Sequence, residues 1–103
     1  MENENKQTYS HKIFTIRDAK ANTFDSRILV QRTTAEGLRT FQSLCTDQNT
    51  MVGKYPEDFA FFELGEFDET SASFKIHKQA INLGLAAQFA KPDGNVPSMK
   101  AVN

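Results

Sequence analysis

A single stretch of this sequence has a well-defined amphipathic helical pattern, and this limits the chain to one main helix. The apolar positions fall at i, i+3, i+6 and i+7 and are Leu38, Phe41, Leu44 and Cys45. Thr33 followed three residues later by Glu36 matches a capping box, in which each side chain accepts a hydrogen bond from a backbone N–H. We therefore predict a helix over residues 34–46, weakened slightly by Gly37 in its first turn.

The segments around this helix are rich in β-branched and aromatic residues or alternate apolar with polar ones, as strands do. The predicted strands are residues 12–17, 26–32, 59–67 and 72–77. We expect a turn at residues 68–71, which makes the last two strands a β-hairpin, and a bulge or close backbone approach at Gly65. This order predicts an α+β fold, with the helix packed on an antiparallel sheet.

The remaining segments lack a clear period. We expect a loop at residues 18–22 and a polar connection at residues 47–56, whereas residues 80–90 fit either a short strand or a short helix. The length of 103 residues suits one domain. It divides into a disordered head (1–11), a single α+β domain (12–90) and a flexible tail (91–103) that holds two of the three prolines.

Two properties of the sequence bear on where the protein resides. No apolar run approaches the roughly 20 residues that cross a bilayer. The polar N-terminus also lacks the apolar core of a secretory signal. We expect the protein to stay in the compartment where it is made, with no membrane partner.

The charge of the chain is balanced overall but uneven along its length. Twelve basic and thirteen acidic residues give a net charge of −1, which is not the strongly basic balance of an autonomous nucleic-acid-binding domain. Residues 57–69 nevertheless hold six acids and no base. Residues 12–39 are net basic, and the candidate DNA contacts there are Arg17, Lys20, Arg27, Arg32 and Arg39. The two stretches are either ordinary solvated faces or a basic face for phosphate and an acidic face for a protein partner or self-association.

Nine phenylalanines and two tyrosines are many for so short a chain. Most must fill the core of a small domain. Exposed aromatic side chains beside a basic strip are also how single-stranded DNA is bound, through base stacking. The core role is the stronger interpretation of these aromatics; the candidates for the alternative, in which one or two rings are exposed for stacking, are Phe14, Phe24 and Tyr55.

Motifs for catalysis or metal binding are absent from the sequence. Cys45 is the only cysteine, which excludes an internal disulfide and a zinc knuckle; its position fits a small core residue better than a reactive thiol. His11 and His77 have no neighbouring ligands at metal-binding spacing, and the five glycines are scattered singly. We expect no catalytic residue, no metal and no cofactor, and therefore no enzyme.

Three stretches together resemble a known family. They are residues 12–21 (KIFTIRDAKA), 35–44 (AEGLRTFQSL) and 54–68 (KYPEDFAFFELGEFD), followed by a closing LGLA at residues 83–86. In this order they are similar to the small nonstructural protein of gokushovirus-type microviruses, which are phages with circular single-stranded DNA. The resemblance implies action in the host bacterial cytoplasm during single-strand synthesis and packaging of the viral DNA.

Two functions follow as hypotheses. The first is a non-enzymatic phage nonstructural protein that serves single-stranded DNA replication or packaging through weak DNA binding. The alternative is an assembly or interaction factor that binds only proteins, such as viral replication or capsid proteins or further copies of itself. The positions of the five basic residues separate the two: one contiguous basic face supports DNA, and scatter among acids supports protein contacts.

Overall fold

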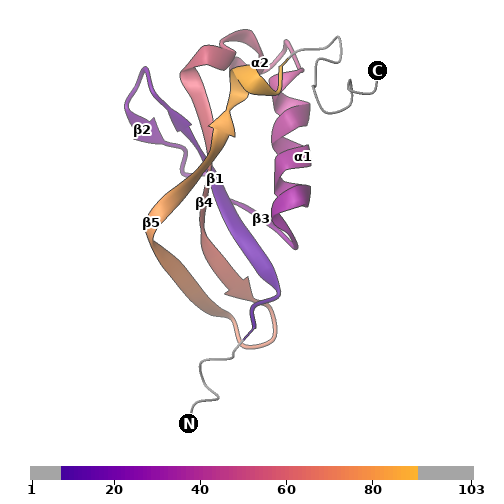
Figure 1. Cartoon of the computed structure of the whole chain (residues 1–103), viewed down its shortest axis with the longest axis vertical. Helices are drawn as coiled ribbons and strands as arrows, with labels where there is room; N and C mark the ends of the chain where they lie inside the picture. The colour runs from indigo at the N-terminus through magenta and orange to yellow at the C-terminus, as the bar shows by residue number, and fades with distance from the viewer. Residues whose placement is uncertain (1–7, 91–103) are drawn as a thin grey trace.

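A curled antiparallel sheet forms the body of the protein, and one long helix runs across one of its faces (Figure 1). The computed structural model describes residues 8–90; the rest of the predicted head and the whole predicted tail lie outside the described residues. The elements in chain order are β1 (His11–Asp18), β2 (Thr23–Phe24), β3 (Leu29–Gln31), α1 (Thr34–Cys45), α2 (Met51–Lys54), η2 (Pro56–Asp58), β4 (Phe59–Asp68), β5 (Ser73–Leu85) and η3 (Ala86–Gln88). The predicted α+β fold, with one main helix on an antiparallel sheet, is confirmed.

The sheet has the strand order β2-β1-β4-β5, and all of its pairs are antiparallel. The short strands β2 and β3 both pair with β1, and β4 pairs with β1 and with β5. The pairing of β4 changes register next to Gly65 on both sides, so the predicted irregularity at this glycine is confirmed. Such a shift bends a strand and strengthens its twist, which fits the curl of the sheet.

The strand before the helix, β3, is shorter than predicted, and the additional short strand β2 precedes β3. Residues 26–32 were expected to be extended, but β3 includes only Leu29–Gln31. The reason is turn chemistry at Asp25, whose carboxylate accepts hydrogen bonds from the backbone N–H and the guanidinium of Arg27. The chain therefore leaves β1 after β2 and rejoins it at Leu29.

The predicted polar connection at residues 47–56 contains the short helix α2 and the start of η2. Thr50 caps α2, because its side-chain oxygen accepts a hydrogen bond from the N–H of Gly53 at 3.0 Å. Pro56 occupies the first position of η2, where a missing N–H costs nothing. Further along, the ambiguous segment 80–90 continues β5 to Leu85 and then forms η3.

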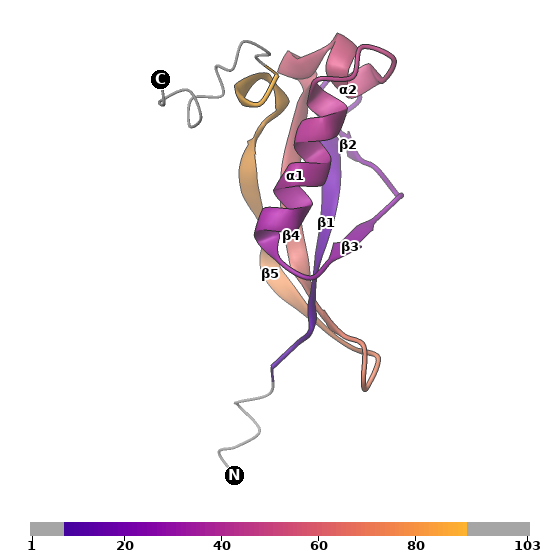
Figure 2. The same cartoon turned by 90° about the vertical axis from the view of Figure 1, so that its right-hand side faces the viewer.

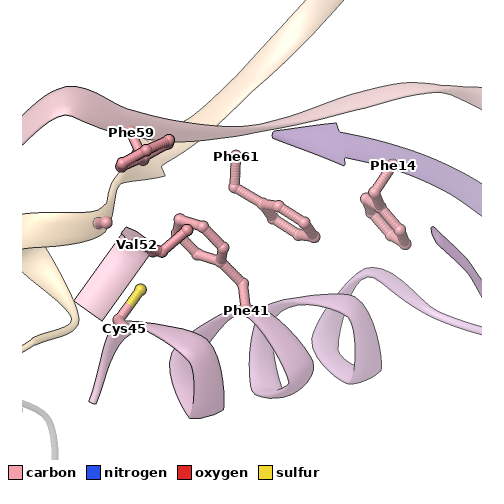
Figure 3. Packing of buried hydrophobic residues seen from close by; sticks show 7 residues of the cluster. Phe14, Phe41, Cys45, Val52, Phe59 and Phe61 are labelled. Atoms are coloured by element: carbon pink, nitrogen blue, oxygen red, sulfur yellow. The ribbon is translucent and has the colours of Figure 1, made fainter. Parts of the chain in front are cut away.

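The predicted helix forms as α1, and Thr33 caps it by accepting a hydrogen bond from the Glu36 N–H at 3.1 Å. Its apolar side packs on the sheet, with Phe41 and Cys45 fully buried and Leu38 and Leu44 half-buried (Figure 3). The predicted helix stripe is therefore confirmed.

Three stacked phenylalanine rings join the helix to the sheet. Phe61 of β4 lies between Phe14 of β1 and Phe41 of α1, with ring centroids 5.0 Å and 4.6 Å away and nearly parallel planes (Figure 3). Phe89, after η3, meets Phe41 edge-on at 5.7 Å. Residues of β1, β3, α1, α2, β4, β5 and η3 thus belong to one core.

The helix covers only one face of the sheet. Figure 2 looks onto α1, with the strands β1, β4 and β5 behind it. The β4–β5 hairpin extends beyond the end at which α1 begins (Figures 1 and 2). On the opposite face of the sheet there is no helix of residues 8–90, and we call it the helix-free face.

Candidate nucleic-acid interface

Alternation along β1 and β4 sends neighbouring residues to opposite faces of the sheet. Ile16 and Phe61, which are cross-strand partners, belong to the core beneath α1. Thr15 and Phe62 form the next pair and therefore lie on the helix-free face. Arg17 follows Ile16 in the chain, so it too lies on the helix-free face.

An aromatic platform lies on this face where β2 pairs with β1. We define it as Arg17, Phe24 and Phe62. The guanidinium carbon of Arg17 lies 5.6 Å from the ring centroid of Phe24, its cross-strand partner. Phe24 meets Phe62 edge-on, with centroids 5.2 Å apart, and is 49% exposed. The platform thus presents an aromatic ring to solvent beside a fixed positive charge.

The turn between β1 and β2 holds this platform in place. The Asp18 carboxylate accepts hydrogen bonds from the backbone N–H groups of Lys20 and Ala21, at 3.0 Å and 3.2 Å. Asn22 takes a left-handed conformation with φ of 60°, which asparagine tolerates better than most residues, and its side-chain oxygen accepts from Arg17. The turn therefore fixes both the strand pairing and the direction of the Arg17 side chain.

The five candidate basic residues do not share one surface, and two of them lie beside acids. The contiguous basic face expected for DNA binding therefore does not form, and by this criterion their placement favours the protein-binding alternative. Arg17 and Lys20 belong to the β1–β2 hairpin, and neither forms an ion pair with a carboxylate of residues 8–90. Arg27 is exposed in the following loop and is paired with Asp25, N to O, at 2.9 Å. The other two lie apart from this hairpin and are Arg32, which comes 3.9 Å from Glu69, and Arg39, on the exposed side of α1.

The three aromatic candidates also separate. Phe24 and Tyr55 are exposed, as the stacking alternative requires of one or two rings. Phe14 is the candidate that is not available for base stacking, because it is fully buried in the ring stack. Alternate residues of a strand face opposite sides of the sheet, and Phe14 lies on the side of β1 that α1 covers.

The acidic stretch 57–69 is not one surface, because Glu63 points under the helix and is only 6% exposed. Its carboxylate accepts a hydrogen bond from the Thr34 hydroxyl at 3.0 Å and lies 2.8 Å from Nε2 of His77. Lys12 Nζ donates to Glu66 at 2.9 Å and lies 3.9 Å from Glu63. The hydrogen bond to Glu66 raises the pKa of Lys12. These groups tie β1, α1, β4 and β5 together, a structural role that the charge count did not reveal.

A groove of about 780 Å³ opens beside the core, between the β2–β3 loop and α2. Its walls are mainly apolar and include Ile28, Leu44 and Met51. Its polar groups bond to the protein itself: the Thr15 hydroxyl donates to the Asp25 carbonyl, and the Thr50 hydroxyl to the Leu44 carbonyl. The groove therefore offers few directed groups for a substrate.

A comparison with protein families matches residues 11–89 to the Phage ORF5 protein family. The chain belongs to the Phage ORF5 protein family. The match runs from the first residue of β1 to Phe89 of the core, and so includes the aromatic platform. No curated protein and no solved structure matches the chain.

Membership of this family shows that the chain is a bacteriophage protein. The expected resemblance is confirmed to that extent. Within residues 8–90, no helix is long and apolar enough to cross a membrane. The same residues contain no group of three or more His, Cys, Asp or Glu side chains arranged to hold a metal ion. Burial raises the pKa of the Cys45 thiol to about 12, which disfavours its reactive thiolate form.

Proposed function

We propose that this ORF5 protein is a non-enzymatic nonstructural protein of a gokushovirus-type microvirus. It acts in the host bacterial cytoplasm during replication or packaging of the viral single-stranded DNA. Its activity is weak binding of single-stranded DNA on the helix-free face, alongside viral replication or capsid proteins. The observation that carries this proposal is the aromatic platform, with Arg17 fixed over the exposed ring of Phe24.

The chemistry of the platform supports single-stranded rather than duplex DNA. An exposed ring stacks on an unpaired base of any type, which contributes about 1–3 kcal/mol per base. A base stacked on Phe24 brings its phosphate near Arg17, which forms no ion pair with a carboxylate of residues 8–90. An open sheet face is also accessible to a flexible strand, whereas a duplex does not present its bases for stacking.

The small number of unpaired basic residues limits the affinity for single-stranded DNA. The net charge is −1, and Arg27 is already neutralised by Asp25. With one phosphate neutralised by Arg17, single-strand affinity should fall with salt at a log–log slope of about −0.7, from roughly 0.7 per phosphate. Such binding assists a replication or packaging complex and does not coat the genome alone.

The first experiment is a salt series of fluorescence anisotropy with a labelled oligothymidine and the full chain. Phe24→Leu removes the stacking ring but keeps an apolar side chain, and should weaken binding about 5-fold or more. Arg17→Ala should weaken binding and reduce the salt slope by about 0.7.

The matched control is Arg39→Ala, which removes the same charge from the exposed side of α1. It should leave the affinity nearly unchanged. Equal losses for Arg17→Ala and Arg39→Ala would mean that the charge of the whole molecule, rather than the platform, attracts DNA. No binding at low salt would remove the DNA function and leave the alternative, an assembly factor that binds only proteins.

A further inference from the structure

A second exposed apolar surface lies on the helix-free face, toward the β4–β5 hairpin. Cross-strand pairing aligns four residues in one row across β3, β1, β4 and β5, and these are Val30, Ile13, Gly65 and Ile76. The adjacent pair is Phe67 and Phe74, whose ring centroids are 5.0 Å apart. We define the hairpin patch as Val30, Phe67, Phe74 and Ile76.

The hairpin patch is exposed to an extent that folding alone does not explain. Phe74 is 63% exposed, Ile76 62% and Val30 45%. The hairpin extends past the end of α1 (Figure 1), and α1 covers the other face. Contiguous apolar side chains left open in this way mark interaction surfaces.

Two charged residues of the hairpin, Lys75 and His77, are held on the other face. Glu69 instead lies 3.9 Å from His11, the cross-strand partner of Phe67. Lys75 is the cross-strand partner of Glu66, and Glu66 binds Lys12. His77 binds Glu63, whose side chain lies beneath α1. The four residues of the hairpin patch are therefore themselves uncharged, and the groups at its border carry both signs, since Glu69 lies 3.9 Å from both Arg32 and His11. In a two-fold contact each patch meets its own copy, so a charged patch would repel itself, whereas this one is self-complementary.

Sheet extension through the edge strand β5 is the other way for two copies to meet, and two features of β5 oppose it. Its pairing with β4 shifts register twice, and irregular strands make poor templates for a further strand. Exposed Lys75 and Lys78 would also approach their own copies along such an edge. The partner is therefore expected on the face of the sheet.

The area of the hairpin patch suits a weak dimer. The exposed parts of Val30, Phe74 and Ile76 amount to about 300 Å² per copy, or about 600 Å² for two copies. If a dimer buries all of this apolar area with a polar rim of the usual proportion, so that about 57% of the interface is apolar, it buries at most about 1,000 Å² in total. That total lies at the lower limit for specific interfaces.

We propose that the hairpin patch binds a second copy of this chain in a two-fold, face-to-face dimer. The dimer forms with a dissociation constant of about 10–100 μM, as expected for a small interface. It requires no DNA and does not depend on the function proposed above. The aromatic platform, which shares no residue with the hairpin patch, remains available in each copy.

The test is sedimentation velocity on the full chain, without DNA, from about 5 μM to about 1 mM. The wild-type protein should change from monomer to dimer across this range. Ile76→Glu places a charge opposite its own copy and should keep the protein monomeric throughout. Phe74→Thr retains a strand-forming residue and should weaken the dimer about 10-fold or more.

Met51→Glu is the matched control, because Met51 is 60% exposed but lies on α2. It should dimerise like the wild-type protein, and circular dichroism should show all variants folded. A wild-type chain that stays monomeric at about 1 mM would overturn the proposal, and the partner of the hairpin patch would then be a different protein. An Ile76→Glu variant that still dimerises, or species larger than a dimer, would also overturn it.

Discussion

The two faces of the sheet carry similar aromatic residues but have different surroundings. On the covered face, Phe61 lies between two parallel rings and is 1% exposed. On the helix-free face, Phe74 touches one neighbouring ring and is 63% exposed. The two rings differ in exposure because the domain has only two layers, the sheet and one long helix, and this helix covers only one face of the sheet.

This contrast separates stability from function within one sheet. A small domain needs its buried rings, because a single core supplies most of the stability of a chain this short. Exposed residues of the open face, such as Phe24 and Phe74, contribute less to folding and are therefore free to serve binding. The aromatic platform and the hairpin patch divide that open face, with the positive charge of Arg17 only on the platform.

The largest expected effect tests the contrast directly. Phe41→Ala removes the ring that stacks on Phe61 and should lower the free energy of unfolding by about 3–5 kcal/mol. Phe74→Ala removes the same atoms from the open face and should cost less than about 1 kcal/mol. Urea unfolding of both variants at low protein concentration measures the difference, and equal costs would show that the two faces stabilise the fold alike.

A smaller effect is expected at Gly37, where α1 packs against the Phe14 ring of β1. A Cβ at this position would lie 2.5 Å from Cε2 and 2.6 Å from Cζ of the buried Phe14 ring. Alanine favours a helix over glycine by about 1 kcal/mol, but overpacking a core costs about 1–3 kcal/mol. We expect Gly37→Ala to be destabilising by about 1 kcal/mol, as measured by thermal unfolding.

Ser43→Ala is the matched control for this substitution, because Ser43 is an exposed residue of the same helix. It gains helix propensity without a clash and should stabilise the protein by a few tenths of a kcal/mol, roughly. If Gly37→Ala stabilised the protein to the same degree, the helix would not pack as closely on Phe14 as the structure shows.

Gly37 illustrates what the sequence predicts and what it does not. Its slight weakening of the helix follows from local propensity, but its contact with Phe14 depends on tertiary packing. The helix, the β4–β5 hairpin and the irregularity at Gly65 follow from strong local patterns, and the structure confirms them. The strand β2 and the helix α2 have two and four residues, too few for any period to be recognised.

The same limit applies to the candidate site. Arg17 and Phe24 were both candidates from the sequence, but their contact results from the β1–β2 pairing. Phe62 was not a candidate, since alternation alone does not show which face of β4 is covered. Glu63 belonged to an acidic run, and only the position of Thr34 above the sheet shows that it is buried and bonded.

The smallest expected effect concerns the Lys12–Glu66 pair at the rim of the covered face. The hydrogen bond to Glu66 raises the pKa of Lys12 above its ordinary 10.5; partial burial opposes this shift and the Glu63 charge supports it. A raised pKa contributes stability that is fully present below the unfolded value of 10.5 and is lost as pH rises through the folded value. Glu66→Gln should therefore cost at most about 1 kcal/mol at neutral pH, and this cost should shrink at more alkaline pH. Urea unfolding of both proteins on either side of pH 10.5 measures the change. A cost independent of pH would show that the ammonium–carboxylate pair does not stabilise this rim, leaving the Phe14–Phe61–Phe41 stack as the main support of the covered face.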